Sequence, residues 1–580
     1  MFKLRVDTGG TFTDCWGLAA EESHPRLVKV LSSGFLRVSV ESWISETEAR
    51  LDLPESWETK NAFFTGYRFR AGGETALVLR YDDSTQSVHL SHPLPPSSSA
   101  DLFTREEAPV LGARLLTGTS LDESFPPLEF RLATTRGTNA LLERKGSPPA
   151  LFISEGFGDL LTIRDQRRPD LFALQHHRTA PLHKTVVEIR GRLDPEGNEI
   201  SPLSLGEEFE IAARSCLKSD TSTAAVALLH SYQNSTHELA VRDRLIELGF
   251  KHVSVSSDLA PLIKVLPRAE TAVANAYLHP VMQSFLEGVH ERTGKESTLL
   301  TMTSAGGLEP VTGYCPKDSL LSGPAGGISG AAAVAEDLGV RQILTFDMGG
   351  TSTDVARYDA GFQYRFEQVV GDARLLCPSL KIETVASGGG SICRWEEGSL
   401  RVGPESAGAD PGPACYGGGG PLTITDVNLL LGRINPENFG IPLGPENLDA
   451  AQAAAKELQA AAGVRSERPD PSFLEGLLDI AVEQMADAIQ TISIRDGADP
   501  ADYALLAFGG AGPLHACEIA ERLAIETILV PGEAGLLSAY GLERASVERF
   551  AESQVDLTAD DPELAGRLAR TEAEARTKLE

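Results

Sequence analysis

Short apolar runs alternate along this chain with segments in which apolar residues recur at helical spacing. The run Ala224–His230 is apolar almost throughout, which is typical of a parallel strand buried on both faces. His237–Leu248 then shows helical spacing, and Val253–Ser256 predicts the next strand. Strands that alternate with helices in this way predict an α/β fold with a mainly parallel sheet.

The same pattern extends over most of the chain. It predicts strands at 25–32, 76–81, 150–154, 298–302 and 503–508, and helices at 140–145, 270–294, 328–338, 473–494, 514–523 and 559–580. The helix at 270–294 is expected to be interrupted only at Pro280. Residues 36–128 are rich in β-branched residues and turn signals, so they predict an inserted β-rich module. Residues 386–420 are dense in glycine and are expected to form loops.

One octapeptide pattern occurs twice. Residues 7–14 read DTGGTFTD and residues 347–354 read DMGGTSTD, so six of eight positions agree. Each copy follows an apolar run and precedes another strand-like run, which predicts a strand, a tight glycine turn and a second strand. The two copies indicate a duplicated domain, and strand Thr298–Met302 is expected to open the second half.

These turns have a clear chemical use. Two adjacent glycines let phosphate oxygens approach bare backbone N–H groups, and neighbouring Thr hydroxyls add donors. An Asp at the end of the preceding strand, here Asp7 or Asp347, can hold Mg²⁺ or orient an attacking group. Other nucleotide sites are disfavoured, because the chain has no G-x-x-x-x-G-K-[S/T] motif and the octapeptides return as strands rather than opening a helix.

A third glycine-rich segment, Gly509–Gly512, lies between a predicted strand and a predicted helix. That geometry suits the nucleoside end of ATP beside a helix N-terminus. Close packing between strand and helix is the structural alternative.

Composition narrows the class of protein. The formal net charge of −30 disfavours nucleic acid and anionic membranes as partners, although much of it serves solubility. Seven cysteines without a C-x-x-C pair, no visible signal peptide and no long apolar run predict a reduced, cytoplasmic protein with no membrane partner. The 559–580 helix ends without a cap, so we expect the chain to be part of a longer polypeptide.

Several dense motifs resemble those of the hydantoinase/oxoprolinase family, within the actin-like ATPase superfamily. Besides the octapeptides they are RGTNALLER at 136–144, RPDL at 168–171, SGPAGG at 322–327, GGGS at 388–391, GPESAGADPGPACY at 403–416 and FGGAGPLHA at 508–516. The resemblance implies two actin-like (ribonuclease H-like) lobes with mixed and parallel sheets. Their expected bounds are 1–270 and 271–555, and 556–580 would begin a further region.

The resemblance also implies ATP-dependent opening of a cyclic amide, with 5-oxoproline to glutamate preferred. The alternatives are a hydantoinase, the ATP-using subunit of a ketone carboxylase such as acetone carboxylase, and an actin- or chaperone-like switch protein. ATP, Mg²⁺ and a monovalent cation such as K⁺ would be the cofactors. A hydantoinase B-like half, fused or separate, and a homo- or hetero-oligomer are the expected partners.

The candidate site residues follow from the matching segments. The phosphate and nucleoside candidates are Thr8, Gly9, Gly10, Thr11, Thr13, Gly349, Gly350, Thr351, Ser352, Gly509 and Gly510. The catalytic candidates are Asp7, Asp347, Asp14, Asp354 and Asp426, of which Asp7 and Asp347 would hold the metal. The substrate candidates are Arg136, Asn139, Arg168 and Asp410.

Two alternatives stay open among these candidates. Asp426 could instead be the N-cap of a helix at 427–431, and each Arg could form an ordinary surface ion pair. The chain also departs from its relatives at Lys381 and Glu383, where many carry Asp and His or Asn, so a metal site is not expected there.

Overall fold

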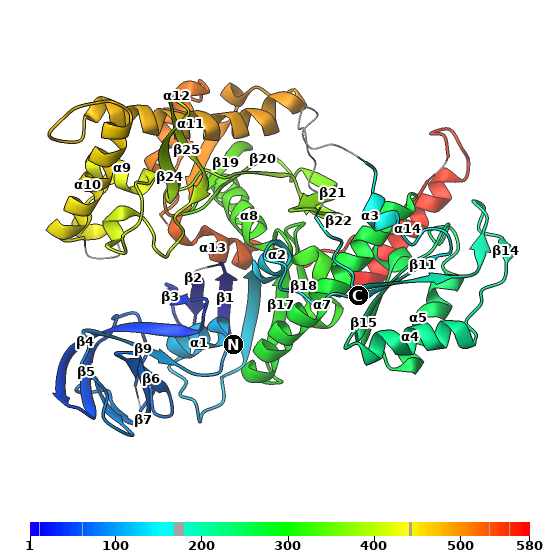
Figure 1. Ribbon diagram of the computed structural model, residues 1–580, viewed down its shortest axis with the longest axis horizontal. Helices are drawn as coiled ribbons and strands as arrows, with labels where there is room; N and C mark the ends of the chain where they lie inside the picture. The colour runs from blue at the N-terminus through cyan, green and yellow to red at the C-terminus, as the bar shows by residue number, and fades with distance from the viewer. Residues whose placement is uncertain are drawn as a thin grey trace. The chain divides into compact units, whose positions relative to one another are not determined.

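A computed structural model describes residues 1–10, 12–60, 62–166, 179–439, 443–532, 534–555 and 557–579 (Figure 1). The chain forms two compact units. The first contains Met1–Gly323, Arg365–Ser379 and Ala545–Glu580, and the second contains Pro324–Tyr364 and Leu380–Arg544. The expected functional lobes, 1–270 and 271–555, stay a prediction.

The main sheet of the first unit begins with the first octapeptide. Its strands are β1 (Phe2–Thr8), β2 (Phe12–Leu18), β3 (Arg26–Leu31), β10 (Leu128–Thr134), β17 (Thr298–Met302) and β18 (Leu308–Pro310). Their order is β18-β17-β10-β1-β2-β3. Strands β1, β2 and β3 are antiparallel neighbours, whereas β10 is parallel to β1 and β17 is parallel to β10.

The sheet of the second unit repeats this topology. Its strands are β19 (Gln342–Met348), β20 (Thr353–Asp359), β23 (Ile382–Val385), β26 (Ala504–Phe508) and β27 (Ile528–Leu529), in the order β23-β20-β19-β26-β27. The first three are antiparallel, and β26 and β27 run parallel to β19. The order and directions match those of β3-β2-β1-β10-β17. The duplicated α/β domain predicted from the octapeptides is therefore confirmed.

A closed barrel is inserted between β3 and β10 (lower left in Figure 1). It consists of β4 (Phe35–Ser45), β5 (Glu48–Asp52), β6 (Arg68–Ala71), β7 (Glu74–Asp82), β8 (Ser87–Leu90) and β9 (Ser99–Phe103). Buried aromatic residues, among them Phe63, Phe64 and Phe69, belong to the same hydrophobic core as β1. The β-rich texture of 36–128 thus corresponds to a barrel followed by helix α1 (Ala108–Thr117).

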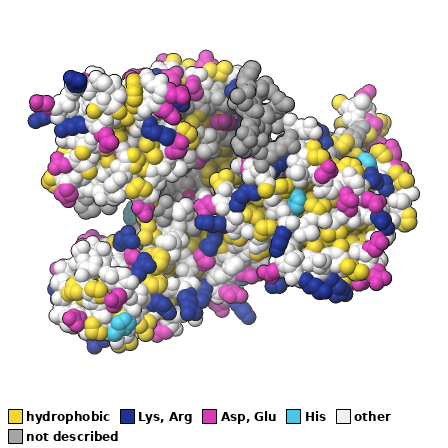
Figure 2. Space-filling view, in the orientation of Figure 1, with side chains coloured by type: hydrophobic (Ala, Val, Ile, Leu, Met, Phe, Trp, Pro, Cys, Tyr) yellow, Lys and Arg dark blue, Asp and Glu magenta, His cyan; other side chains and the backbone are white. Residues whose placement is uncertain are grey.

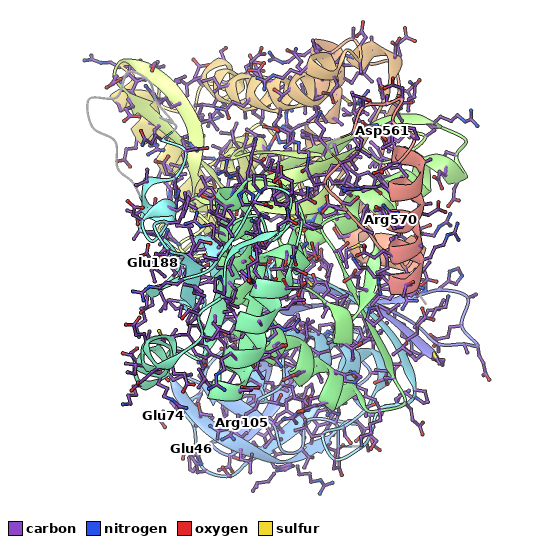
Figure 3. All side chains as sticks on the ribbon, turned by 90° about the vertical axis from the view of Figure 1, so that its right-hand side faces the viewer. Glu46, Glu74, Arg105, Glu188, Asp561 and Arg570 are labelled. Atoms are coloured by element: carbon purple, nitrogen blue, oxygen red, sulfur yellow. The ribbon has the colours of Figure 1, made fainter. Side chains whose placement is uncertain are left out.

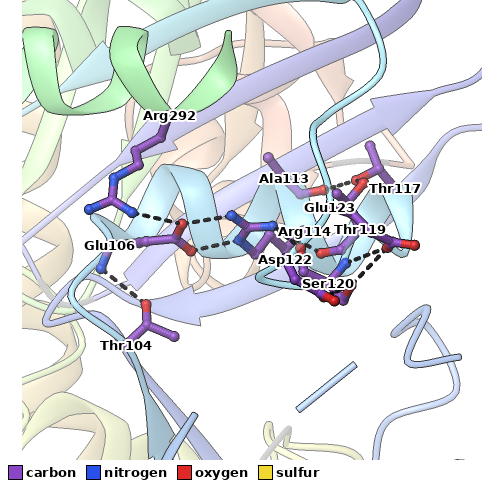
Figure 4. A network of polar contacts seen from close by, with 10 residues as sticks. All are labelled: Thr104, Glu106, Ala113, Arg114, Thr117, Thr119, Ser120, Asp122, Glu123 and Arg292. Atoms are coloured by element: carbon purple, nitrogen blue, oxygen red, sulfur yellow. Dashed lines mark hydrogen bonds and ion pairs between the residues drawn. The ribbon is translucent and has the colours of Figure 1, made fainter. Parts of the chain in front are cut away.

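A buried ion pair joins Arg114, in the last turn of helix α1, to Glu106, just before the helix begins (Figure 4). Arg114 donates two hydrogen bonds to the Glu106 carboxylate, at 2.7 and 2.8 Å, and Arg292 lies 3.7 Å from the same group. Both Arg114 and Glu106 are almost fully buried. The bidentate geometry compensates for the desolvation of the two charges.

A third, fully parallel sheet lies in the first unit. It has the order β12-β11-β15-β16, from β11 (Ala150–Ser154), β12 (Thr185–Ile189), β15 (Thr223–Ala227) and β16 (His252–Val255). Helices α4 (Glu207–Lys218) and α5 (Thr236–Leu248) pack with it, as does the long α7 (Val265–Thr293). The apolar run at 224–230 is shorter as a strand than expected, since β15 ends at Ala227.

Three expectations about individual elements were wrong. Helix α7 continues through Pro280, with Leu278 and Met282 buried on either side of the proline. The glycine run at 322–327 lies inside α8 (Ser322–Asp337) rather than before it. Strands β17 and β18 complete the first sheet instead of opening the second half.

The α8 glycines have a packing role. A Cβ on Gly330 would lie 2.5 Å from the Leu537 carbonyl oxygen, and one on Gly326 would lie 3.1 Å from that of Ser538. Helix α13 (Leu537–Arg544) therefore approaches α8 too closely for larger residues. Helical packing, rather than a loop, explains this glycine run.

The segment 386–420 is not all loop. It contains the antiparallel hairpin β24 (Ser391–Glu396) and β25 (Ser399–Ser406), whose Cys393 and Val402 are buried with residues of α11 (Pro471–Ser493). The remaining α-helices and strands with described bounds are α2 (Arg136–Leu142), α3 (Leu160–Ile163), β13 (Arg192–Leu193), β14 (Glu199–Ser201), α6 (Ser256–Leu259), β21 (Tyr364–Val370), β22 (Ala373–Leu380), α9 (Ile424–Leu430), α10 (Pro445–Ala461), α12 (Ala516–Arg522) and α14 (Leu564–Leu579).

The surface is strongly charged and mixed. Acidic, basic and apolar side chains are interspersed over the face in Figure 2. Helix α14, which contains Arg570 and begins just after Asp561, both labelled in Figure 3, has no buried residue. Among the described helices, none combines the length and the apolar character that crossing a membrane requires.

Candidate functional site

The first glycine turn joins β1 to β2 at the carboxyl end of β1. The N–H of Gly9 donates to the Phe12 carbonyl at 3.0 Å and closes the turn. In the strand register Asp7 faces Asp14 and Thr8 faces Thr13. The predicted hairpin is confirmed, while Thr11 lies outside the described residues.

This turn leaves hydrogen-bond donors available. The Thr8 side chain is buried, and its hydroxyl has no hydrogen-bond partner within the described parts of the chain. Gly10 is exposed, and its N–H donates no backbone hydrogen bond to any described residue. A hydroxyl and a bare N–H at a tight turn suit phosphate oxygens, so the residues present fit a nucleotide phosphate.

The end of the parallel strand β10 lies beside this turn. Thr135 donates its N–H to the Thr8 carbonyl at 2.9 Å, and the Asn139 amide donates to the Thr135 hydroxyl at 3.3 Å. A Cβ on Gly10 would lie 3.6 Å from the Asn139 amide nitrogen. Of the substrate candidates, Asn139 is therefore next to the first turn.

The start of α8 also reaches Asp7. A Cβ on Gly323 would lie 3.6 Å from a carboxylate oxygen of Asp7 and 3.3 Å from the Thr135 methyl group. The preceding Ser322 hydroxyl exchanges hydrogen bonds with the backbone of Thr134. The glycine run at 322–327 thus contributes its first residues to this site as well as to helix packing.

Arg136 has structural partners. Its guanidinium pairs with Glu107 at 2.7 Å and stacks over the Phe285 ring at 4.7 Å. These contacts match the surface ion pair considered as the alternative for this residue. Arg168, the other candidate for binding a substrate carboxylate, lies outside the described residues.

The second glycine turn has the same construction. The Gly349 N–H donates to the Ser352 carbonyl at 3.1 Å, and Asp347 faces Asp354 in the strand register. The Gly350 N–H donates no backbone hydrogen bond to a described residue, and Thr351 is exposed. This turn can therefore also present backbone donors to an anion.

The outer aspartates of the two turns differ in their partners. Asp14 forms an ion pair with Lys29 of β3 at 2.9 Å, whereas Asp354 accepts a hydrogen bond from Thr384 of β23 at 2.5 Å. Burial raises the pKa of both carboxyls, and Lys29 partly offsets the effect at Asp14 as Thr384 does at Asp354. Strand register alone places Lys29 and Thr384 at equivalent positions.

The second turn rests on a layer of further glycines. The N–H groups of Gly389 and Gly390 donate to the carbonyls of Gly349 and Gly350, at 3.1 and 2.7 Å. A Cβ on Gly388 would lie 2.7 Å from the Thr351 backbone, so only glycine fits. The 388–391 motif therefore packs closely against the second turn and donates hydrogen bonds to its backbone.

The distinctive 403–416 segment joins this layer. The Ala407 N–H donates to the Gly390 carbonyl at 2.9 Å, and Thr425 binds the Gly389 carbonyl through both its N–H and its hydroxyl. Asp410, expected to contact substrate, is exposed in a turn of this segment. The segment is thus connected to the second glycine turn through hydrogen bonds.

Asp426 anchors the same segment. It is fully buried and accepts four hydrogen bonds, from the N–H groups of Ala414, Cys415 and Thr423 and from the Thr423 hydroxyl. It is residue N3 of α9 in a capping box with Thr423, so the alternative that Asp426 is itself the N-cap of a helix at 427–431 was wrong. Its oxygens are already occupied by backbone and side-chain donors, which favours a structural role.

The Gly509–Gly512 loop lies at the end of β26, next to β19. Gly509 has φ +78°, and a Cβ there would lie 2.3 Å from an Asp347 carboxylate oxygen. A Cβ on Gly510 would meet nothing within 4 Å. Gly509 is thus required for packing against Asp347, while Gly510 faces open space. The roles proposed for the two glycines must therefore differ.

His515, at the start of α12, is fully buried beside Asn428. Burial lowers its pKa to about 4, so it is neutral near pH 7. The FGGAGPLHA motif at 508–516 contains His515, whereas Lys29, Thr135 and Thr384 were missed because none of them lies in a motif.

A metal ion would need ligands from these turns. No group of three or more His, Cys, Asp or Glu able to hold a metal occurs within the described residues. Mg²⁺ commonly uses only one or two carboxylates and completes its shell with water and phosphate oxygens. Asp7 and Asp347, each at the end of a strand beside a glycine turn, fit that requirement.

The chain matches known proteins along most of its length. Residues 98–249 match the hydantoinase/oxoprolinase N-terminal region, and residues 268–550 match the hydantoinase/oxoprolinase family. The chain is 37% identical to 5-oxoprolinase 1 of Arabidopsis thaliana over 77% of its own length and 39% of that protein. It is 35% identical to an uncharacterised protein of Methanocaldococcus jannaschii, over 82% of this chain and 72% of that protein.

A solved structure shows the same fold. The ATP-dependent caprolactamase from Pseudomonas jessenii is 25% identical and has a TM-score of 0.73, covering 100% of this chain and 76% of the other. The chain spans about two fifths of the length of the 5-oxoprolinases that it matches. With both family regions matched in order, the chain belongs to the hydantoinase/oxoprolinase family.

Proposed function

We propose that this chain provides the ATP-using part of an enzyme that opens a cyclic amide by hydrolysis. The preferred reaction converts 5-oxo-L-proline to L-glutamate, with ATP converted to ADP and phosphate. The observation that carries the proposal is the pair of matched glycine turns with their facing aspartates, in a chain related to 5-oxoprolinases.

The chemistry explains why ATP is needed. A five-membered lactam is stabilised by amide resonance, so water attacks it slowly. Transfer of the γ-phosphoryl group to the amide oxygen leaves ADP and gives a carbon that water attacks readily. After water has added to that carbon, the ring C–N bond breaks, the nitrogen takes up a proton, and an acyl phosphate forms. A second water then hydrolyses the acyl phosphate to the open-chain amino acid and phosphate. Such phosphoryl transfer depends mainly on positioning and charge neutralisation.

In this proposal residues of both glycine turns bind ATP. Thr8, Gly10 and Gly350 supply donors to phosphate oxygens, and Gly510 borders the nucleoside. Asp7 and Asp347 hold Mg²⁺, whose charge would offset that of the phosphates. Asn139, beside Gly10, offers an amide donor to the lactam or its carboxylate.

The proposal extends to partners and compartment. A hydantoinase B-like half, on the same polypeptide or separate, would complete the enzyme, and K⁺ is a candidate monovalent cofactor. The Pseudomonas jessenii relative named caprolactamase subunit alpha, which is 32% identical, supports a multi-subunit arrangement. All seven cysteines are free, in keeping with the proposed cytoplasmic location.

The test is ADP release by the chain, alone and with a hydantoinase B-like partner, in the presence of 5-oxoproline and Mg²⁺. We expect Asp7→Asn and Asp347→Asn each to reduce turnover by about 100-fold or more, with ATP binding retained in at least one variant. If 5-oxoproline produces no turnover in the assembled enzyme while acetone plus bicarbonate does, the carboxylase alternative replaces this proposal.

A second candidate substrate is a different ring. The similarity in fold to a caprolactamase favours a larger lactam, and the family name also includes hydantoinases, which favours hydantoins. The same assay with caprolactam and with hydantoins, compared by kcat/KM, ranks the three ring classes. A kcat/KM for caprolactam at least tenfold above that for 5-oxoproline would contradict the preferred substrate.

A further inference from the structure

A small cavity lies within the first unit, where two hydrophobic clusters meet. One cluster contains Leu161 and Val273, and the other contains Leu141. Leu182 packs against both clusters and lines the cavity together with these three residues. Most of the remaining lining comes from the end of α2 and from the β21–β22 hairpin. None of the described residues assigned to ATP or the lactam lines this cavity.

The uncharged part of the lining is aliphatic. No aromatic side chain is among the described residues that line the cavity. Leu142 is 54% exposed, and Leu182 and Val370 are half-buried, so these three side chains have surface that a ligand can contact. Leu161 and Val273, which also line the cavity, are almost fully buried. Such a surface suits a short aliphatic chain, whose burial is favourable.

The charged part of the lining is balanced, with two cations and two carboxylates. These side chains are Arg144, Arg164, Glu270 and Asp372. Glu270 is already bound, because Arg374 donates to its carboxylate at 2.8 Å. Arg144 donates to the Ala180 carbonyl at 2.8 Å, and its guanidinium lies 3.7 Å from the Asp372 carboxylate, which is too far for a hydrogen bond.

Arg164 and Asp372 retain hydrogen-bonding groups for a ligand. The Arg164 guanidinium forms no ion pair with any described residue, and it donates one long hydrogen bond, at 3.4 Å, to the Asp372 backbone carbonyl. The Asp372 side chain is 51% exposed, and within the described parts of the chain its carboxylate accepts no hydrogen bond. A cation and a carboxylate therefore lie close together in one lining without pairing with each other.

The backbone of Arg164 gives a separate indication that this position is constrained. Its φ is +56° and its ψ is −151°, a conformation that a residue with a side chain rarely adopts. The Arg164 N–H donates to the Leu160 carbonyl at 2.8 Å, which helps to fix this conformation. Strained residues of this kind gather where a protein holds a ligand.

We propose that this cavity binds a small aliphatic α-amino acid in its zwitterionic form. The Arg164 guanidinium donates to the carboxylate of the ligand, and the Asp372 carboxylate accepts hydrogen bonds from its ammonium group. The aliphatic side chain of the ligand packs against the leucine and valine side chains of the lining. An α-amino acid carries its two charges on neighbouring groups, which suits a guanidinium only 3.4 Å from the backbone of Asp372.

The size of the cavity limits the ligand to a short side chain. Its volume is about 80 Å³. A single water needs about 10–15 Å³, so the cavity holds a molecule about as large as five to eight waters. Alanine and valine lie within this range, whereas phenylalanine and glutamate exceed it. The proposed site does not rest on the lactam reaction and would exist even if that function were wrong.

The test is calorimetric titration of the 580-residue chain with L-valine at physiological ionic strength. We expect saturable binding to one site per chain. Arg164→Gln and Asp372→Asn should each weaken binding by about tenfold or more, because each removes a charge that the zwitterion contacts. Arg105→Gln and Asp449→Asn, at exposed positions outside the lining, are the charge-matched controls and should leave affinity unchanged.

Titrations with two analogues of valine identify the head group that binds. Isovalerate lacks the amino group of valine, and isobutylamine lacks its carboxylate, so valine should bind about tenfold or more tightly than either. L-Phenylalanine and L-glutamate should bind more weakly than L-valine, because they are too large for the cavity.

Four results would each overturn the proposal. They are no saturable binding of L-valine, equal affinity for isovalerate or isobutylamine, tighter binding of L-glutamate or L-phenylalanine, and equal weakening by the cavity variants and their controls. Near-ultraviolet circular dichroism of the unliganded variants checks folding. Asp372→Asn, at an exposed turn, provides an independent measurement if the fold of Arg164→Gln is perturbed.

Discussion

Asp14 and Asp354 occupy equivalent positions in the two repeats, yet one pairs with a lysine ammonium and the other with a threonine hydroxyl. Each faces the strand-end aspartate of its own turn, Asp7 or Asp347. The first repeat therefore carries a fixed positive charge, Lys29, where the second has a neutral donor. The two turns share a backbone design but differ in their electrostatics, so substitutions in them should not have equal effects.

Replacing Thr8 with Val should separate binding from stability. The Thr8 hydroxyl is buried without a partner in the described chain, so its removal should leave the free energy of unfolding unchanged or slightly higher. The KM for ATP should rise several-fold if this hydroxyl binds phosphate. Urea unfolding and steady-state ATPase assays measure the two effects. The matched control is Thr13→Val, whose hydroxyl bonds Ser32 at 2.9 Å and whose loss should cost about 1 kcal/mol.

Asp426→Asn should destabilise the second unit. Its four hydrogen bonds need an acceptor at both oxygens, and an amide NH₂ would instead face the N–H groups of Thr423 or the 414–415 backbone. We expect a loss of about 2–4 kcal/mol in urea unfolding. Asp410→Asn, at an exposed position in the same segment, should change stability by less than about 0.5 kcal/mol. Equal stability of the two variants would contradict the anchoring role of Asp426.

Gly509→Ala and Gly510→Ala should behave differently. At Gly509 the positive φ and the 2.3 Å approach to Asp347 make a Cβ costly. We therefore expect Gly509→Ala to lower the free energy of unfolding by about 1–3 kcal/mol and to reduce activity. At Gly510 a Cβ meets nothing, so stability should be kept. If Gly510 borders the nucleoside, its substitution alone should weaken ATP binding, measured with a fluorescent nucleotide. Unchanged ATP affinity would remove Gly510 from the site.

The stability of the first unit should fall in mild acid because of His252. Burial and the stacked ring of His279, 3.5 Å away, lower the pKa of His252 to about 3. An unfolded histidine has a pKa of about 6.5, so between these values the unfolded state binds a proton that the folded state does not. Stability due to His252 is complete above pH 6.5 and decreases by about 1.4 kcal/mol per pH unit below it.

The measurement compares urea unfolding at pH 7.5 and 5.5. His252→Asn should flatten the pH dependence relative to the parent chain, whereas His92→Asn, at an exposed position of the barrel, should leave it unchanged. If the parent chain and His252→Asn lose the same stability between pH 7.5 and 5.5, groups other than His252 cause the effect.

The repeated octapeptides were enough to predict the duplicated sheet, because strand ends and tight glycine turns are encoded locally. The wrong predictions concern features that depend on contacts between residues far apart in the sequence. Nothing near Pro280 in the sequence shows that α7 stays continuous, and the sequence does not show that the glycines at 322–327 lie inside α8, where they allow the close approach of α13. The assignment of β17 to the first sheet depends on pairing with a strand about 170 residues away, which no local pattern records.

The candidate site was predictable only in part. Motifs identified both turns and Asn139, whereas Lys29 and Thr384 lie on neighbouring strands without a motif of their own. Asp426 was recognised as important, but its four donors come from a segment whose path cannot be inferred from spacing. Buried polar networks depend on tertiary contacts, and so their roles become visible only in the fold.

The barrel lies in the connection between the third and fourth strands of the first repeat, β3 and β10. The second repeat carries its own large addition, from β24 to α11, between the equivalent strands β23 and β26. Both repeats thus carry a long insertion in the same connection between equivalent strands, while their sheet order stays intact. That connection therefore accommodates added domains, but the barrel cannot simply be removed from it, because doing so would expose Leu4 and Val6 of β1, which share its hydrophobic core.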